Sequence, residues 1–433
     1  MTRRMILFSA PRQDLLARLL MVLMVAVILA PCTFAAEAGD EDSVEVQAAR
    51  EKWVKNKGYK VYYTKKFDLS DLPHYKPERK VSGTIRMWGS NYFTDSPLMD
   101  YWIKEFQQSQ PDVKFNLHLK TTLHAIPGLI FGMSDIGPMG RQITWDELLA
   151  YQRERNHLPI GIVAVTGSYD VSGWNPPIGV YLHKDNPLSK LSLQQLDGIF
   201  GAQRSGAWRD LTWDKSLARG PEKNFRTWGQ LGLTGEWADK PIHVYGYNLQ
   251  FHFPQEIESR AFGGVSKKWN ENLIEYDNML QPDGSFKLAG QIMLEDLAKD
   301  PYGIAYCAGG NAWLTPQIKP VALSIKTGDP AYELTLENVR ERTYPMYADV
   351  FFYIDRDPKK PVDPKVKEFI RYILSQEGQA HVMRDGKYLP LTAKVVRELL
   401  KLLDYCLAVH LRLPAASPPA KAVAAPLSSV IHG

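Results

Sequence analysis

The stretch Ile178–Gly201, with the sequence IGVYLHKDNPLSKLSLQQLDGIFG, decides the fold class of this chain. Its apolar beginning, IGVYLHK, predicts a strand. A short helix is predicted over the segment SLQQLDGIFG, because the hydroxyl of Ser192 can cap its amino terminus and Gly201 can end it. A strand that is followed by a helix is the repeating unit of an α/β protein.

The same alternation of strands and helices extends outward from this stretch in both directions. Strands are predicted at residues 83–90, 113–120, 134–140, 160–167, 242–248, 303–310, 319–325 and 344–355. Helices are predicted at residues 96–111, 125–133, 144–154, 291–301, 364–386 (a helix pair) and 393–403. Thr144 and Glu147 match a capping box at the start of one of these helices. We therefore expect an α/β fold with mainly parallel sheets.

The composition is that of a folded protein, with 433 residues, 45% of them hydrophobic and 23% charged. The length predicts about two to three domains. The formal net charge is +4, and most of the excess lies in the first 35 residues, where four arginines face a single aspartate. The rest of the chain is close to neutral, so bulk charge does not favour a nucleic-acid partner.

The amino-terminal residues have the layout of a secretory signal peptide, which we place at residues 1–35. Arginines precede the apolar run Leu19–Ala30, which is shorter than the roughly 20 residues that span a bilayer. An uncleaved anchor and lipidation at Cys32 are the alternatives that we favour less. Removal of the signal peptide leaves Cys307 and Cys406, and the sequence leaves open whether they form a disulfide.

The sequence lacks the common catalytic and nucleotide-binding motifs. It contains no Walker A sequence, no G-x-G-x-x-G after a strand, no H-E-x-x-H and no G-x-S-x-G. His118 and His124 are close in sequence but have no third metal ligand nearby. We therefore expect no catalytic residues, no metal and no cofactor.

Several ordered segments together resemble the periplasmic phosphate-binding proteins of ABC transporters. The segments are GTIRMWGSN (83–91), SDIGPMGRQITWDEL (134–148), HKDNPLSKLSLQQLDGIFG (183–201), WRDL (208–211), DPYGIAY (300–306), YPMYADVFFY (344–353), VKEFIRYILSQEGQ (366–379) and YLPL (388–391). The resemblance implies the two-lobe type II periplasmic-binding-protein fold, in which each lobe has a mainly parallel sheet flanked by helices and the ligand lies in a cleft between the lobes.

This resemblance also implies a division of the chain. Residues 36–80 would form a lead-in, residues 81–174 plus 345–403 the first lobe, and residues 175–344 the second lobe. Residues 404–433 would form a carboxyl-terminal tail that is largely disordered from about residue 413, where alanine, proline and serine dominate.

The resemblance places three ligand-binding loops in the first lobe, at the carboxyl ends of strands. Backbone N–H groups at such positions can bind an anion without any net positive charge. The predicted ligand contacts there are Ser90, Asn91, Tyr92, Thr121, Thr122, Gly140 and Arg141. Two structural alternatives stay open: in one, Ser90 or Asn91 only caps a helix, and in the other, Arg141 only forms an ion pair with Asp146 or Glu147.

The second lobe would contribute Tyr247 and Asn248, but here the chain departs from the family pattern. Tyr247 stands where the family has an arginine, and Phe251–Phe253 stands where it has Ser-Gly-Thr. Aromatic side chains can line a cleft for an organic ligand, or they can fill a cleft that no longer binds anything. The aromatic residues concerned are Trp88, Tyr92, Phe93, Tyr247, Phe251 and Phe253.

We therefore predict a monomeric, periplasmic receptor that is not an enzyme. Its default ligand is phosphate or another oxyanion, and its partners are the membrane subunits of an ABC transporter, with no nucleic acid. One alternative is the same fold with an organic or aromatic ligand. The other is a scaffold or sensor protein whose ligand site has degenerated.

Overall fold

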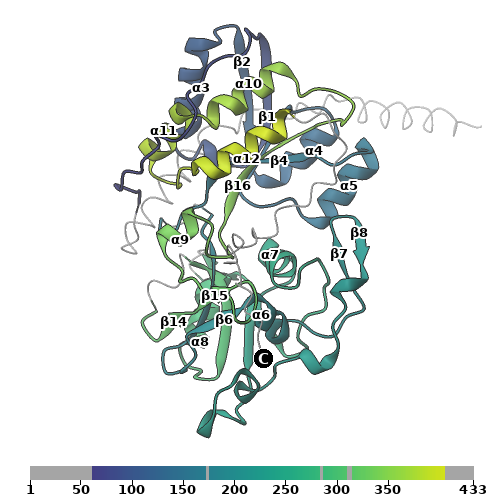
Figure 1. Cartoon of the computed structure of the whole chain (residues 1–433), viewed down its shortest axis with the longest axis vertical. Coiled ribbons are helices and arrows are strands. Elements are labelled where there is room, and N and C mark those ends of the chain that lie inside the picture. The colour runs from purple at the N-terminus through teal and green to yellow at the C-terminus, as the bar shows by residue number, and fades with distance from the viewer. Residues whose placement is uncertain (1–60, 172–174, 283–285, 310–314, 405–433) are drawn as a thin grey trace, which may run out of the picture. The chain divides into compact units, whose positions relative to one another are not determined.

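Strand β1 (Gly83–Gly89) lies between β2 (Val113–Leu119) and β3 (Ile136–Met139) and pairs with both of them in parallel. This trio belongs to the first of two five-stranded sheets found within the described residues of the computed structural model (Figure 1). The structure describes residues 61–171, 175–282, 286–309 and 315–404. The predicted signal peptide, Cys32, the first part of the lead-in, Cys406 and nearly all of the carboxyl-terminal tail lie outside these residues.

The first lobe is built on the sheet with strand order β2-β1-β3-β16-β4. Strands β16 (Asp349–Ile354) and β4 (Ile160–Thr166) complete the sheet, and β16 is antiparallel to both of its neighbours. The helices of this lobe are α3 (Leu98–Ser109), α4 (Ala125–Ile130), α5 (Trp145–Arg155), α10 (Pro364–Ile373), α11 (Gln376–Asp385) and α12 (Ala393–Asp404). The 3-10 helices η1 (Asn91–Phe93) and η2 (Thr122–His124) follow β1 and β2.

The second lobe is built on the sheet with strand order β10-β9-β13-β5-β14. Its strands are β5 (Ile178–His183), β9 (His243–Tyr247), β10 (Leu273–Tyr276), β13 (Gly303–Ala308) and β14 (Ile318–Pro320). Its helices are α6 (Leu193–Phe200), α7 (His252–Arg260), α8 (Ala289–Leu297) and α9 (Leu336–Arg340).

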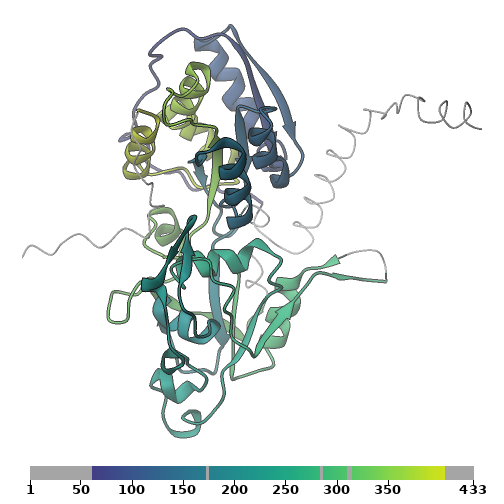
Figure 2. The same cartoon turned by 90° about the vertical axis from the view of Figure 1, so that its right-hand side faces the viewer.

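Three short strand pairs accompany this second sheet. They are β6 (Lys190–Ser192) with β15 (Ala322–Ser324), β7 (Ala207–Arg209) with β8 (Thr212–Asp214), and β11 (Met279–Leu280) with β12 (Phe286–Lys287). Figure 2 shows the hairpin of β11 and β12 projecting from the second lobe. Four 3-10 helices lie between β8 and β9, namely η3 (Lys215–Leu217), η4 (Pro221–Lys223), η5 (Trp228–Leu231) and η6 (Gly235–Trp237).

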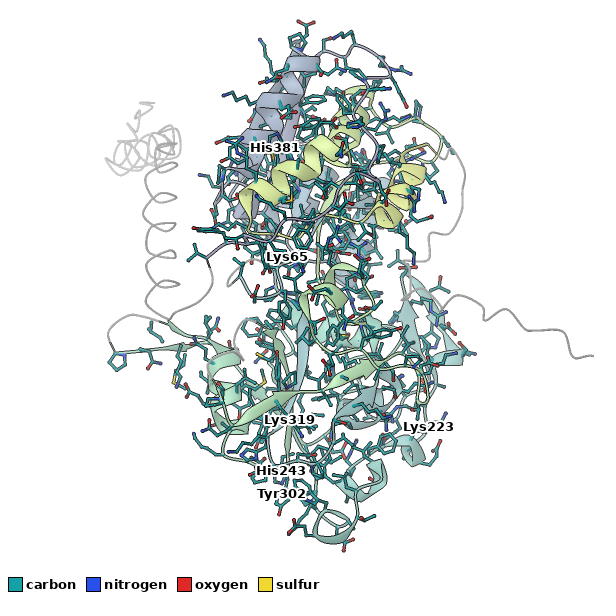
Figure 3. The ribbon with its side chains drawn as sticks, turned by 60° about the vertical axis from the view of Figure 1, so that its left-hand side comes forward. Lys65, Lys223, His243, Tyr302, Lys319 and His381 are labelled. Atoms are coloured by element: carbon teal, nitrogen blue, oxygen red, sulfur yellow. The ribbon has the colours of Figure 1, made fainter. Side chains whose placement is uncertain are left out.

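The chain passes between the two sheets twice, at the first crossover between β4 and β5 and at the second crossover between α9 and β16, and the parallel strands of both sheets end near these crossovers. The chain leaves the first sheet at the end of β4 and enters the second at the start of β5, and β5 is antiparallel to β13. The parallel strands β9 and β13 therefore end where β5 begins. In Figure 3, His243 and Tyr302 mark the opposite, amino ends of β9 and β13. Ligand sites in α/β proteins lie at such carboxyl ends.

The helix starts that were predicted from capping residues are present in the structure. Thr144 and Glu147 form the capping box of α5, and Ser192 forms a second one with Gln195 at α6. The pair of helices at 364–386 is found as α10 and α11.

The structure also corrects several predicted elements. Helix α7 was not predicted at all, the strand at 319–325 is divided into β14 and β15, and the strand at 344–355 begins only at Asp349. Val321 separates β14 from β15 and donates its backbone N–H to the carbonyl oxygen of Val180 at 2.9 Å.

The described part of the lead-in, residues 61–80, contains no helix or strand, but several of its residues form hydrogen bonds with the rest of the first lobe. The hydroxyl of Tyr75 and the backbone N–H of Glu78 donate hydrogen bonds to the buried carboxylate of Glu368 in α10. The backbone N–H of Tyr63 donates to the carbonyl oxygen of Gly386 at 2.6 Å. The lead-in is therefore part of the first lobe's packing.

The same segment also reaches the first crossover and helix α9. The hydroxyl oxygen of Tyr63 accepts hydrogen bonds from the backbone N–H groups of Tyr169 at 2.6 Å and Asp170 at 3.1 Å. Lys65, labelled in Figure 3, forms an ion pair with Glu337 of α9. The lead-in thus contacts both the α11 end of the first lobe and the region of the crossovers. The predicted division between lobes at 174/175 and 344/345 stays a prediction.

Candidate ligand-binding site

The first of the predicted loops follows β1 and is organised by Ser90. This side chain is 1% exposed and caps η1, because its hydroxyl accepts a hydrogen bond from the backbone N–H of Tyr92 at 3.3 Å. The neighbouring amide of Asn91 donates to Asp95 at 2.6 Å. Ser90 also donates its own N–H to the carbonyl oxygen of Pro138 at 2.8 Å, which ties this loop to β3. The capping alternative is therefore realised in this structure.

The second and third loops are joined to the first through hydrogen bonds and close packing. Thr121 donates its N–H to the carbonyl oxygen of Gly89 at 2.9 Å, and Gly140 donates its N–H to the hydroxyl of Thr122 at 3.5 Å. A Cβ atom on Gly140 would lie 2.5 Å from a ring carbon of Tyr92, so any larger residue there would have to displace the Tyr92 ring. The predicted first-lobe residues are thus brought together at one edge of the sheet.

Arg141 is held by Glu147 in the first turn of α5. Its two terminal nitrogens donate to the two carboxylate oxygens at 2.7 and 2.8 Å, and the arginine side chain is only 10% exposed. Burial alone would raise the pKa of Glu147, but the hydrogen bonds and charge of Arg141 together with the hydrogen bonds from Thr144 lower the pKa overall. The ion-pair alternative of the sequence analysis is found, with Glu147 as the partner.

The predicted second-lobe residues are engaged within their own lobe. The hydroxyl of Tyr247 lies 3.2 Å from the sulfur of Cys307 and accepts from the N–H of Ala308 at 3.2 Å, and the residue is only 4% exposed. The side-chain oxygen of Asn248 accepts from the N–H of Gln250 at 3.0 Å. Tyr247 therefore joins β9 to β13, and Asn248 supports the turn after β9.

A cavity lies between the Arg141 loop, helix α7 and the two crossovers. Its enclosed space is about 20 Å³, which is room for about one water molecule, so a ligand can enter only when the walls move apart. Its lining includes Arg141 from the first lobe, His252, Glu256 and Arg260 from α7, and Tyr347 from the crossover. Glu256, Arg260 and Tyr347 were not predicted from the sequence, whereas His252 belongs to the stretch that stands in place of the family's Ser-Gly-Thr. Pro254 in the first turn of α7 is the signal that could have revealed this helix.

The charges around the cavity are matched. Arg260 pairs with Glu256 at 3.3 Å, just as Arg141 pairs with Glu147. Burial, reinforced by the nearby charge of Arg141, lowers the pKa of His252 to about 4. His252 is therefore neutral at pH 7, and its ring can offer one N–H donor.

The amino terminus of helix α7 adds to this wall of the cavity backbone N–H groups that no capping side chain binds. Its N-cap residue is Phe251, so no side chain caps its amino terminus. The first backbone N–H groups of a helix carry partial positive charge, and they attract anions when they are left uncapped. His252 and Phe253, the first residues of α7, line the cavity.

Two negative observations concern the described residues alone. No three or more histidine, cysteine, aspartate or glutamate side chains come together there in a way that could hold a metal ion. No helix in the same part of the chain has the length and apolar character needed to cross a membrane.

Comparison with known proteins decides the family. The sequence model of the PBP superfamily domain matches residues 76–377. The phosphate-binding protein PstS of Pseudomonas aeruginosa is 30% identical over 330 residues, which cover 76% of this chain and 90% of that protein. The chain belongs to this family. The predicted resemblance to phosphate-binding proteins is therefore confirmed.

Two solved structures are also similar to this PstS-type chain, with sequence identities below the 30% found for the Pseudomonas protein. A possible phosphate-binding protein from Planctomyces limnophilus is 18% identical with a TM-score of 0.40, and the match covers 76% of this chain and 100% of that one. An ABC-type phosphate transport receptor from Vibrio cholerae is 16% identical with a TM-score of 0.42, and the match covers 71% of this chain and 100% of that one.

Proposed function

We propose that this protein captures phosphate or a related oxyanion between its lobes and delivers it to the membrane subunits of an ABC transporter. The observation that carries the proposal is the 30% identity to phosphate-binding protein PstS, which extends over 90% of that protein. The signal-peptide pattern of residues 1–35 supports a periplasmic location, reached by secretion. We further propose that the protein acts as a monomer without catalytic activity.

The cavity offers the kind of groups that bind an oxyanion. Arg141 has a planar fork of N–H donors, His252 has a neutral ring N–H, and the uncapped start of α7 adds backbone N–H groups. The hydroxyls of Ser90, Thr121 and Thr122 belong to the first-lobe loops joined to the Arg141 loop, but they do not line the cavity itself. The ligand would then displace existing hydrogen bonds, because Thr122 and Arg141 already have partners here.

One specific observation favours a second ligand class. Phe253, Tyr347 and Phe351 line the same cavity, and aromatic walls around a few polar groups are typical of sites for small organic molecules. An organic anion, such as a phosphate ester or a carboxylate, would use the same donors and bury an apolar part against these rings.

Isothermal titration of inorganic phosphate into the ligand-stripped protein tests the proposal. We expect a dissociation constant in the micromolar range or tighter, at least tenfold weaker binding of sulfate, and a rise in melting temperature with phosphate. No heat and no thermal shift at millimolar phosphate would overturn the proposal for phosphate. The same titration with small organic phosphates and carboxylates would then test the second ligand class.

A matched pair of variants locates the site. Arg86 also forms a two-nitrogen contact with a carboxylate of the first lobe, since it donates to Asp135 at 2.7 and 3.2 Å, but it does not line the cavity. We expect Arg141→Ala to abolish phosphate binding and Arg86→Ala to leave it unchanged. Equal effects of the two variants would show that the ligand binds elsewhere.

A further inference from the structure

One glutamine side chain of the second lobe holds two backbone groups of the first lobe. The oxygen of the Gln255 amide accepts a hydrogen bond from the N–H of Trp145 at 2.9 Å. The nitrogen of the same amide donates to the carbonyl oxygen of Ile143 at 3.3 Å. Gln255 lies on α7, one turn after His252 at the cavity. Both hydrogen bonds therefore cross between the lobes.

A second contact reaches the same turn of α5 from the β7–β8 hairpin. The indole N–H of Trp145 donates to the carbonyl oxygen of Asp210 at 3.0 Å. The Trp145 ring packs against Trp208, with 5.5 Å between ring centroids. Figure 1 shows the strands β7 and β8 of the second lobe beside α5 of the first. Helix α7 and the β7–β8 hairpin of the second lobe thus both contact the first turn of α5 in the first lobe.

This turn is directly connected to the Arg141 loop. Glu147, the partner of Arg141, lies in the first turn of α5 and also accepts from the N–H of Thr144 at 2.9 Å. The N–H of Ile143 donates to the hydroxyl of Tyr353 in β16 at 2.9 Å. The segment from Arg141 to Glu147 is therefore fixed to its own sheet on one side and to the second lobe on the other.

We propose that Gln255 and Trp145 form a clasp between the lobes that sets how slowly a bound ligand leaves the cleft. This proposal rests on the proposed function. Hydrogen bonds between lobes exist only while the lobes touch, so they stabilise the closed arrangement over any separated one. A ligand enclosed at the cavity leaves only after separation. The clasp therefore acts on the release rate and, through the closed population, on the apparent affinity.

The test measures phosphate association and release by stopped-flow tryptophan fluorescence in three variants. Gln255→Met keeps the volume of the side chain and removes both of its hydrogen bonds, and Trp145→Phe removes the bond to Asp210. Trp213→Phe is the control, because this exposed ring packs on Trp208 in the same hairpin. We expect roughly tenfold faster release in the first two variants, unchanged association, and wild-type rates in the control.

Unchanged release in both clasp variants would overturn the proposal. Slower association with unchanged release would do so too, because it would show damage to the binding loop. A melting scan of each variant confirms that it is folded. Small-angle X-ray scattering of the ligand-free protein separates the two proposals. If the wild type binds no phosphate, the proposed function fails, and a larger radius of gyration in Gln255→Met than in Trp213→Phe still supports the clasp, whereas equal radii reject it.

Discussion

Arg141 and Glu147 form a hydrogen-bonded pair with both nitrogens and both oxygens engaged, at 2.7 and 2.8 Å, and both side chains are largely buried. The pair gives the guanidinium a fixed orientation at the cavity before any ligand arrives. It also cancels the charge of the arginine. An anion must therefore compete with Glu147 for the donors of Arg141 or use the nitrogen edges that remain.

This relationship predicts opposite effects of two conservative substitutions. Arg141→Lys keeps the positive charge but loses the planar fork, so phosphate should bind at least tenfold more weakly. Glu147→Gln removes the competing negative charge, so phosphate should bind as tightly as in the wild type or more tightly. Titration calorimetry at constant ionic strength measures both effects. Wild-type affinity in Arg141→Lys would show that the arginine does not contact the ligand.

His252 should make the folded protein sensitive to acid. Burial lowers its pKa in the folded state to about 4, whereas an unfolded histidine titrates near pH 6.5. The unfolded state therefore binds a proton that the folded state does not bind between these values. The free energy of unfolding should fall as the pH decreases from about 6.5 to 4, by up to roughly 3 kcal/mol from this residue.

Urea unfolding at several pH values, with His252→Gln beside the wild type, measures that contribution. The variant cannot titrate at this position, so its stability should decline less over the same pH interval. His74→Gln is the control, because His74 is a mainly exposed partner of Glu377. Parallel curves for wild type and His252→Gln would contradict the prediction.

Tyr247 should matter for stability rather than for ligand affinity. Tyr247→Phe would remove the hydroxyl that accepts from the buried N–H of Ala308. We expect a loss of about 1–2 kcal/mol in the free energy of unfolding, because a buried donor would lose its partner. Phosphate affinity should change less than threefold. A large loss of phosphate affinity with unchanged stability would instead show that the Tyr247 hydroxyl contacts the ligand, as predicted from the sequence.

Tyr63 should stabilise the first crossover from outside it. Tyr63→Phe would leave the N–H groups of Tyr169 and Asp170 without this acceptor, at an expected cost of about 1–3 kcal/mol in the free energy of unfolding. Lys65→Ala breaks only an exposed ion pair and should change stability by less than about 0.5 kcal/mol. Denaturant unfolding compares the two, and equal losses would contradict this assignment.

The fold was predictable wherever one local signal dominated. The capping box of Thr144 and Glu147 and the alternating apolar residues of β1 act over a few residues, and both predicted elements are present. Helix α7 was not predictable in this way. Its first residues, His252-Phe253-Pro254, read as aromatic loop, and the helix depends on distant contacts such as that of Gln255 with Trp145, 110 residues away.

The residues of the candidate site likewise divide into those that could be predicted and those that depend on contacts with distant parts of the chain. The family resemblance grouped Ser90, Thr121 and Gly140, and the structure does collect the ends of β1, β2 and β3 at one edge of the sheet. The orientation of Tyr247 could not be inferred, because its hydroxyl partner Cys307 lies on a strand 60 residues away. The cavity residues in the later turns of α7 and in the crossover were missed for the same reason.

The path of the lead-in has a practical consequence for handling this protein. The carbonyl oxygen of Val61 accepts from the ammonium group of Lys387, and Tyr63 then bonds the first crossover. Tyr63 thus holds the lead-in at the first crossover, whereas the clasp of Gln255 and Trp145 joins the lobes at α5. A sensor surface coupled at Val61 would be attached beside the first crossover, leaving the lobes able to separate and a fluorescent label near Trp213 able to report each opening event.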